Sequence, residues 1–234
     1  MKIIAGNWKM NGNIEMLRDM YTALGNVKTE NTIILCVPFT LLNIMGCDGT
    51  QRPANLAIGA QDCSAHEKGQ YTGDVSAEMI AAAGAKYVIV GHSDRRKYHN
   101  ETNEIIHEKA TRACDAGLIP IVCVGDTLQD RQAGKFMEVV TEQVKNSTPA
   151  GPYILAYEPV WAISPNPAAT AKDIAPMHEK IASLIGPECI AVLYGGSANG
   201  RNVAEIMAIP HVDGVLVGAA SLKSEDFVLT IENA

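Results

Sequence analysis

The chain has 234 residues, a formal net charge of −7, 47% hydrophobic residues and 19% charged residues. This composition predicts a folded core, and the length fits one large domain spanning residues 1–234. The acidic balance argues against a nucleic-acid-binding protein, because the only close basic cluster is Arg95-Arg96-Lys97. A small anionic substrate is still compatible with this charge, since it needs only a local positive potential.

The first residues, Met1 to Gly6, run directly into polar Asn7, and no apolar run of 18 residues occurs anywhere in the chain. We therefore expect neither a signal peptide nor a membrane span, and we expect a soluble, cytoplasmic protein without a membrane or nucleic-acid partner. The cysteines lack a CxxC motif, which is typical of reduced thiols rather than of a disulfide framework. They are Cys36, Cys47, Cys63, Cys114, Cys123 and Cys189.

Short apolar runs alternate with segments of helical spacing along the whole chain. The helical pattern is clearest over residues 14–24, 105–113 and 174–184. Strands that are apolar on both faces and joined by helices predict an α/β protein with a closed (β/α)8 barrel of parallel strands, and an open doubly wound sheet is the alternative. The eight predicted strands are Ile3–Gly6, Thr32–Val37, Leu56–Ala60, Tyr87–Val90, Leu118–Val124, Tyr153–Tyr157, Cys189–Leu193 and Val212–Val217.

Polar residues follow nearly every predicted strand. In a barrel of parallel strands these ends meet on one rim, where active sites are built. The polar ends are Asn7-Trp8-Lys9, Gln61-Asp62, Gly91 to Arg96, Gly125-Asp126, Glu158, Tyr194 to Ser197 and Gly218 to Ser221.

The sixth predicted strand ends in an acid beside an apolar loop. Pro159 favours an extended backbone at Glu158, and the residues that follow include Trp161 and end in the turn-forming segment 164–167. Taken alone, a strand-end glutamate is more often solvated than functional. Because the other predicted strand ends are polar as well, the end at Glu158 indicates a functional carboxylate beside a hydrophobic loop, which we call the flap.

The turns after the seventh and eighth predicted strands are rich in small residues. Gly195, Gly196, Gly218, Ala219 and Ala220 allow an anion to approach backbone N–H groups, and barrels commonly hold a phosphate at these two loops. We therefore predict a phosphorylated substrate.

Three other chemistries fit the sequence poorly. Ser197 lacks the closing glycine and the ordered partners of a hydrolase nucleophile. Cys123, inside a predicted strand, is expected to be an inert buried thiol. Cys63 and His66 have a metal-like spacing, but no second pair accompanies them.

Five separated motifs, in order, make the chain resemble the triosephosphate isomerase family over its whole length. They are Asn7 to Asn11, Val90 to Ser93 with Arg95-Arg96, Ala156 to Ile163, Tyr194 to Ser197, and Val217-Gly218.

This resemblance implies a TIM barrel that interconverts dihydroxyacetone phosphate and D-glyceraldehyde 3-phosphate through an enediolate, in glycolysis and gluconeogenesis, without metal or redox cofactor. It implies Glu158 as base and His92 as electrophile. The remaining contacts that it implies are substrate contacts of Lys9 and Asn7, and phosphate contacts by the backbone of Ser164, Ser197, Gly218 and Ala219.

The resemblance also implies a homodimer. The loop Lys68–Asp74 carries Thr72, which is expected to reach the active site of a neighbouring subunit, and Arg95 is expected to pair with Asp74 or Glu101.

The chain departs from the usual family pattern in the loop Ser164 to Ala169, in Asp94 in place of a glutamate, in Ala219 in place of a second glycine, and in being somewhat shorter than is typical. A phosphate-binding barrel with different chemistry, or a non-catalytic phosphometabolite-binding protein, is the alternative. The latter would be expected to have lost one of Lys9, His92 or Glu158, and all three are present.

Overall fold

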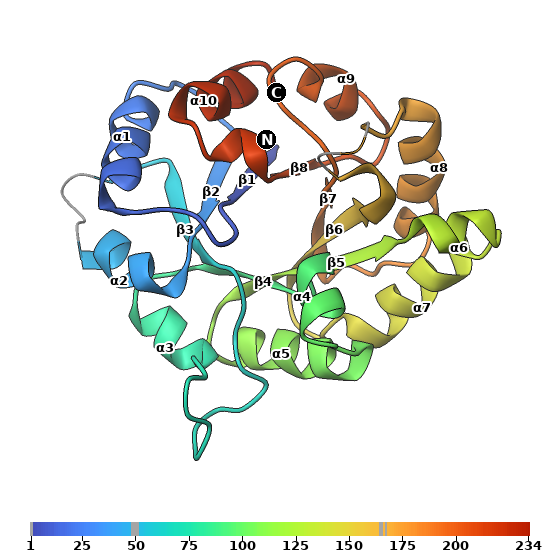
Figure 1. Ribbon diagram of the computed structural model, residues 1–234, viewed down its shortest axis with the longest axis horizontal. Coiled ribbons are helices and arrows are strands. Elements are labelled where there is room, and N and C mark those ends of the chain that lie inside the picture. Colours follow the sequence, from blue (N-terminus) through green and yellow to red (C-terminus); the bar gives the residue numbers. More distant parts are fainter. Residues whose placement is uncertain (1, 48–51, 164–165, 167) are drawn as a thin grey trace.

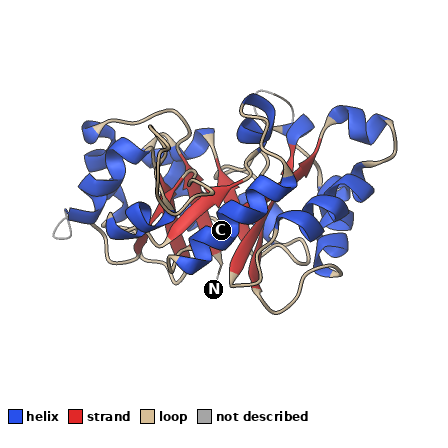
Figure 2. Ribbon diagram, turned by 90° about the horizontal axis from the view of Figure 1, so that it is seen from below, coloured by secondary structure: helices blue, strands red, loops and turns tan. Residues whose placement is uncertain are grey.

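The computed structural model describes residues 2–47, 52–163, 166 and 168–234. In this part of the chain eight parallel strands form a closed barrel, in which each strand pairs with the next and β8 pairs with β1. Figure 1 shows the helices as a ring around these strands, and Figure 2 shows the strands inside that ring from the side. The strands are β1 (Ile3–Asn7), β2 (Thr32–Cys36), β3 (Leu56–Ala60), β4 (Tyr87–Val90), β5 (Ile119–Asp126), β6 (Tyr153–Pro159), β7 (Cys189–Tyr194) and β8 (Gly214–Val217).

The predicted closed barrel is therefore confirmed, and the open sheet is wrong because the first and last strands pair. Several strand ends differ from the sequence prediction by one or two residues, among them the end of β6 and the start of β8. Strand β6 continues through Glu158 to Pro159, because it stays in register with Gly125 and Asp126 of β5. Strand β8 begins at Gly214, since the N–H of Val212 is used in a turn to the carbonyl of Ile209.

The predicted helical segments form helices whose starts are fixed by side-chain caps. Asn13 accepts a hydrogen bond from Met16 N at the start of α1, and Thr102 accepts one from Ile105 N at the start of α5. No helix in the described ranges is long and apolar enough to cross a bilayer. The helices are α1 (Ile14–Leu24), α2 (Phe39–Cys47), α3 (Ala77–Ala82), α4 (Ser93–Tyr98), α5 (Asn103–Asp115), α6 (Leu128–Gln132), α7 (Phe136–Ser147), α8 (Ala171–Ala182), α9 (Val203–Met207) and α10 (Ser224–Glu232), with 3-10 turns η1 (Val160–Ala162) and η2 (Ala219–Ser221).

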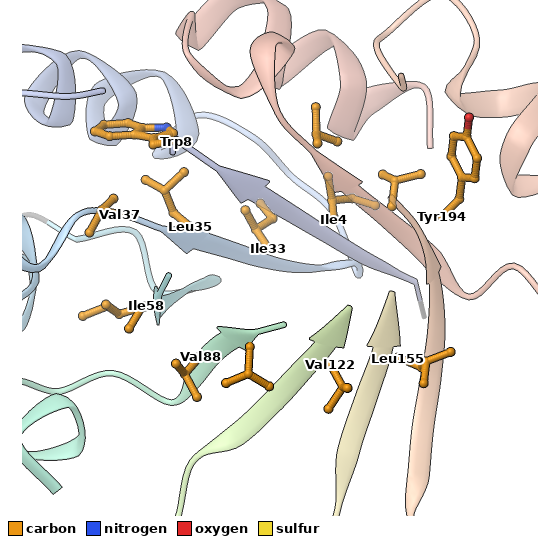
Figure 3. Packing of buried hydrophobic residues seen from close by; sticks show 14 of the residues in the cluster. Ile4, Trp8, Ile33, Leu35, Val37, Ile58, Val88, Val122, Leu155 and Tyr194 are labelled. Carbon is orange, nitrogen blue, oxygen red and sulfur yellow. The ribbon is translucent and has the colours of Figure 1, made fainter. Parts of the chain in front are cut away.

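Side chains alternate along the strands between two apolar layers. On β2, Ile33 and Leu35 belong to the layer between strands and helices, whereas Ile34 belongs to the layer inside the barrel. Figure 3 shows members of the outer layer on several strands, among them Ile33 and Leu35 of β2 and Val122 of β5. Full burial of each such side chain contributes about 1.5–3 kcal/mol, so this alternation fixes which residues face the barrel axis.

The same alternation positions the site. Inside the barrel, the apolar layer includes Ala5 on β1 and Ala156 on β6. Two residues further on, the inward position is occupied by Asn7 and Glu158. The pattern that fills the barrel with apolar side chains thus places polar ones at its C-terminal mouth.

Candidate active site

A cavity of about 910 Å³ opens at the C-terminal ends of the strands. It brings together predicted site residues that are far apart in the sequence. Ser164, which the resemblance assigns to the phosphate, lies outside the described residues. The predicted residues that line the cavity are Asn7, Lys9, His92, Glu158, Ser197, Gly218 and Ala219.

Glu158 is only 2% exposed at the end of β6, and its carboxylate is held by three donors. Ser93 donates from its backbone N–H (2.8 Å) and from its hydroxyl (3.0 Å), and His92 Nε2 lies 2.9 Å from Glu158 Oε1. Burial alone would raise the pKa of Glu158, but His92 and the Ser93 donors outweigh it and lower the pKa below its ordinary value. The carboxylate is therefore ionised at neutral pH although it is buried.

Glycines make room for this carboxylate. A Cβ on Gly125 would lie 2.0 Å from the carbonyl oxygen of Glu158, and a Cβ on Gly195 would lie 3.0 Å from Glu158 Cγ. A side chain at Gly125 would displace backbone, which costs more than displacing a flexible side chain. The glycine next to the end of β5, Gly125, is thus required by the position of Glu158 on the next strand.

His92 precedes helix α4 and is buried beside Glu158. The backbone N–H of Asp94 donates to His92 Nδ1 at 3.1 Å. An imidazole that accepts at Nδ1 carries its proton on Nε2, which is the atom next to Glu158. His92 therefore presents an N–H donor at Nε2 to the cavity.

Lys9 adopts a left-handed backbone conformation with φ 51°. Its N–H donates to Asn7 Oδ1 at 3.0 Å, and its ammonium lies 3.0 Å from Asp94 Oδ2. Such a φ costs a non-glycine residue about 1 kcal/mol or more, and these contacts hold it. Burial opposes ionisation of Asp94, but His92 and Lys9 lower its pKa overall. Asp94 thus connects the cation to the histidine.

The loops expected at the phosphate are linked to the rest of the rim. The Ser197 hydroxyl donates to the carbonyl of Ala162 at 3.0 Å, which joins the β7 loop to the beginning of the flap. Trp8 Nε1 donates to the carbonyl of Ser221 at 2.9 Å, which joins the β1 loop to η2. The first N–H groups of a helical turn have no acceptor within that turn, so Gly218 and Ala219 can offer theirs to an anion.

A second buried carboxylate, Asp126 at the end of β5, anchors the beginning of the flap. It accepts from Tyr157 OH at 2.7 Å, Arg131 Nε at 2.7 Å and Trp161 Nε1 at 3.1 Å. The Arg131 guanidinium also stacks over the Trp161 ring, 4.4 Å from its centroid. Sequence reasoning noted Asp126 as a polar strand end but missed Arg131, whose only signal was its place in the segment directly after that acid.

Behind the site, a buried charged cluster fixes the start of α4. Arg95 pairs with Glu101 at 2.6 Å, which was one of its two expected partners, and with Asp62 at 2.8 Å. Lys109 pairs with both of these acids. The other expected partner, Asp74, instead accepts from the Ser64 hydroxyl at 2.7 Å.

Cys123 is fully buried, and burial raises its thiol pKa well above the ordinary value, so the expectation of an inert side chain is confirmed.

Comparison with known proteins agrees with this geometry. A family model described as triosephosphate isomerase matches residues 2–234. Triosephosphate isomerase of Xanthobacter flavus is 45% identical over 97% of this chain and 94% of its own length, and that of Hyphomonas neptunium is 42% identical over 97% and 95%. A crystal structure of triosephosphate isomerase from Bartonella henselae superposes with a TM-score of 0.88 at 39% identity, covering 99% of this chain and 98% of that one. The chain belongs to the triosephosphate isomerase family.

Proposed function

We propose that the chain interconverts dihydroxyacetone phosphate and D-glyceraldehyde 3-phosphate, with Glu158 as base, His92 as electrophile and Lys9 as the fixed cation. The observation that carries this assignment is that one cavity, in a member of this family, holds all three side chains together with the small-residue loops. A coupled assay with glyceraldehyde 3-phosphate tests it directly. Absence of turnover in the folded protein would contradict it.

The reaction moves a proton between two neighbouring carbons. Glu158 removes it from one carbon, and the electron pair passes to the carbonyl oxygen. The hydroxyl proton of the first carbon then moves to that oxygen beside His92, a new carbonyl forms on the first carbon, and Glu158 returns its proton to the other carbon. His92 Nε2 donates a hydrogen bond to the oxygens of the enediolate, and the Lys9 ammonium stabilises their negative charge. Glu158 accepts two hydrogen bonds from Ser93, and in this mechanism the carboxylate exchanges these donors as it takes the substrate proton.

The phosphate is assigned to the backbone N–H groups of Ser197, Gly218 and Ala219. Support comes from the small residues of both loops, from their place on the cavity and from the 3-10 turn that begins after Gly218. Ser164 stays part of this proposal on the strength of the resemblance alone.

We propose that the active enzyme is a homodimer, joined through the loop Lys68–Asp74. In Figure 1 this loop projects from the barrel between β3 and α3. Its conformation is held within one chain by stacked rings of His66 and Tyr71, whose centroids are 3.8 Å apart. Large apolar side chains are exposed in this loop, on the two helices that follow it and after β1. They are Tyr71 (46%) in the loop, Met79 (59%) on α3, Tyr98 (68%) on α4 and Met10 (97%) after β1.

Sedimentation and activity measured on the same sample test the dimer. We expect a two-fold dimer at micromolar concentration, and a Thr72→Arg variant should shift it to monomer with reduced turnover. A fully active monomer would contradict the role of the neighbouring subunit.

We further propose that residues 1–234 make up one barrel domain and act in the cytoplasm, in glycolysis and gluconeogenesis. Pairing of β1 with β8 supports the single domain. The cytoplasm is supported by free thiols at five described positions, Cys36, Cys63, Cys114, Cys123 and Cys189.

A further inference from the structure

The cavity continues beyond the loops assigned to the substrate phosphate. Its volume of about 910 Å³ lies near the upper end of the range of about 300–1,000 Å³ that holds drug-sized ligands, so a triose phosphate fills only part of it. We call the remaining part the α10 groove. It is lined by Gly200, Arg201, Leu222, Lys223, Asp226 and Leu229.

The walls of the α10 groove are fixed to each other. The loop before α9 touches α10, since Asn233 Nδ2 donates to the carbonyl of Gly200 at 2.7 Å and a Cβ on Gly200 would lie 2.5 Å from Leu229 Cγ. Arg201 N–H donates to Asn199 Oδ1 at 2.9 Å, which sets the backbone of the loop. Figure 1 shows α9 and α10 side by side on this part of the rim.

The charges in the α10 groove are not balanced. Arg201 and Lys223 are exposed, and neither forms an ion pair within the described part of the chain. By contrast, the ammonium of Lys9 is paired with Asp94. Asp226 is the single acid among the groove residues, so the groove has a positive excess in a protein of net charge −7.

Two leucines line the α10 groove together with these cations. Leu229 is 45% exposed, and Leu222 is half-buried on the same cavity. Apolar walls displace water and strengthen the field of nearby charges. A groove with two unpaired cations and apolar walls, continuous with a phosphate site, fits a ligand that carries a second anionic group.

We propose that the α10 groove is a second anion subsite, in which Arg201 and Lys223 bind the distal group of a phosphate compound whose first phosphate lies at Ser197, Gly218 and Ala219. The ligand class is linear polyphosphates and short bisphosphates. Such compounds compete with the triose phosphate, because both use the same phosphate loops. This inference rests on the phosphate assignment in the proposed function.

Competitive inhibition by a length series tests the subsite. Orthophosphate, pyrophosphate and tripolyphosphate are compared as inhibitors of glyceraldehyde 3-phosphate turnover, in metal-free buffer at constant ionic strength. For the wild-type chain we expect pyrophosphate or tripolyphosphate to have an inhibition constant about tenfold below that of orthophosphate. This gain in affinity corresponds to two partly exposed charge contacts. In the double variant Arg201→Ala, Lys223→Ala this gain should disappear while kcat stays within about twofold.

A charge-matched control separates the subsite from the general field. Lys28 and Lys145 are exposed, form no ion pair within the described residues and do not line the cavity. The double variant Lys28→Ala, Lys145→Ala loses the same charge and should keep the gain. Equal gains in both double variants, or no gain in the wild-type chain, would overturn the inference while leaving the phosphate site in place. Failure of orthophosphate itself to compete would overturn the phosphate assignment and the inference together.

Asp226→Asn gives a test that does not depend on removing a cation. This change takes away the acid that opposes Arg201 and Lys223, so pyrophosphate or tripolyphosphate should bind about two- to fivefold more tightly, with orthophosphate changed less. An equal change for all three inhibitors would contradict a distal subsite. Thermal unfolding of each variant, compared with the wild-type chain, shows that the protein remains folded.

Discussion

Two buried carboxylates lie next to each other on neighbouring strands and are held in different ways. Asp126 ends β5 and faces Pro159 in the register, while Glu158 of β6 faces Gly125. Asp126 accepts from a guanidinium, a phenol and an indole. Glu158 accepts from an imidazole, a hydroxyl and a backbone amide, and no lysine or arginine in the described part of the chain pairs with it.

The comparison shows how the fold separates a fixed acid from a movable one. Breaking a buried ion pair such as Asp126 with Arg131 costs about 3–5 kcal/mol. In the proposed mechanism the donors of Glu158 are exchanged for others, because a substrate oxygen takes the His92 N–H. The alternation of β-strand side chains also directs Glu158 into the barrel mouth and its neighbour away from it.

Glu158→Gln should have the largest effect. The amide cannot accept the carbon-bound proton, so kcat should fall by more than about a thousandfold, whereas binding of a substrate analogue should change little. His92→Gln retains a neutral donor and should cost less. Near-normal turnover of the Glu158→Gln protein would remove Glu158 from the role of base.

Asp126→Asn should act mainly on stability. The change removes the charge that faces Arg131 and replaces one of the two acceptor oxygens with an NH2 donor, so the free energy of unfolding should fall by about 3 kcal/mol. Urea titration measures it. Asp19→Asn, at an exposed acid on α1, is the matched control and should change stability by less than about 0.5 kcal/mol. A loss of kcat as large as that of Glu158→Gln would erase the distinction between the two carboxylates.

The sequence predicted one of these carboxylates better than the other. Glu158 was found because the apolar run from Tyr153 ends at it, and polar strand ends mark a barrel mouth. The partners of Asp126 could not be predicted, since Arg131 reaches it only when α6 folds back over the end of β5, and that placement is a tertiary property.

Ser93 stood in a recognised motif, yet its two hydrogen bonds to Glu158 depend on how α4 is oriented against β6. The barrel itself was predictable, because each strand and helix is recognised from the spacing of apolar residues within its own short segment. The end of β6 was placed two residues early, since its pairing with β5 is not local.

Protonation of His178, which packs against a partner of Asp126, should lower the free energy of unfolding at low pH. His178 packs edge-on against Tyr157, with centroids 5.9 Å apart, and its Nδ1 contacts the carbonyl of His211. Burial lowers its pKa from 6.5 to about 4, while the hydrogen bond to the His211 carbonyl and the charge of Asp213 oppose the shift and the His211 ring adds to it.

The unfolded chain binds this proton more readily than the folded one. The contribution of neutral His178 to the free energy of unfolding is therefore fully present above pH 6.5 and declines as the pH falls towards the folded pKa of about 4. The decline should reach about 2 kcal/mol at pH 5. Urea titrations at pH 7.5 and pH 5 measure it, and His178→Phe should flatten this difference. An unchanged difference in that variant would assign the pH dependence to other groups.

Trp161→Phe should have a smaller effect on stability, through the same carboxylate Asp126. The change removes the indole N–H donor to Asp126 and keeps an aromatic ring beside Arg131, so it should cost about 1 kcal/mol of stability. In the Asp126→Asn background the same change should cost clearly less, because the charged acceptor is already absent. Full additivity in the double-mutant cycle would show that the two residues do not interact.

Ser93→Ala should have the smallest effect at neutral pH and a distinct one in acid. Glu158 must be ionised to act, so kcat/KM of the free enzyme is complete above the pKa of Glu158 and falls below it. That pKa is lowered because, against the effect of burial, His92 and Ser93 stabilise the carboxylate, which places the acid limb below pH 4.5.

Alanine removes the hydroxyl donor at 3.0 Å but keeps the backbone N–H, so the acid limb should move to higher pH. At pH 7.5, above both values, kcat/KM should change by less than about threefold, and Ser93→Thr should restore the original limb. An acid limb that does not move would show that the hydroxyl does not stabilise the ionised carboxylate, and the movable acid would then be held by the imidazole and the amide alone.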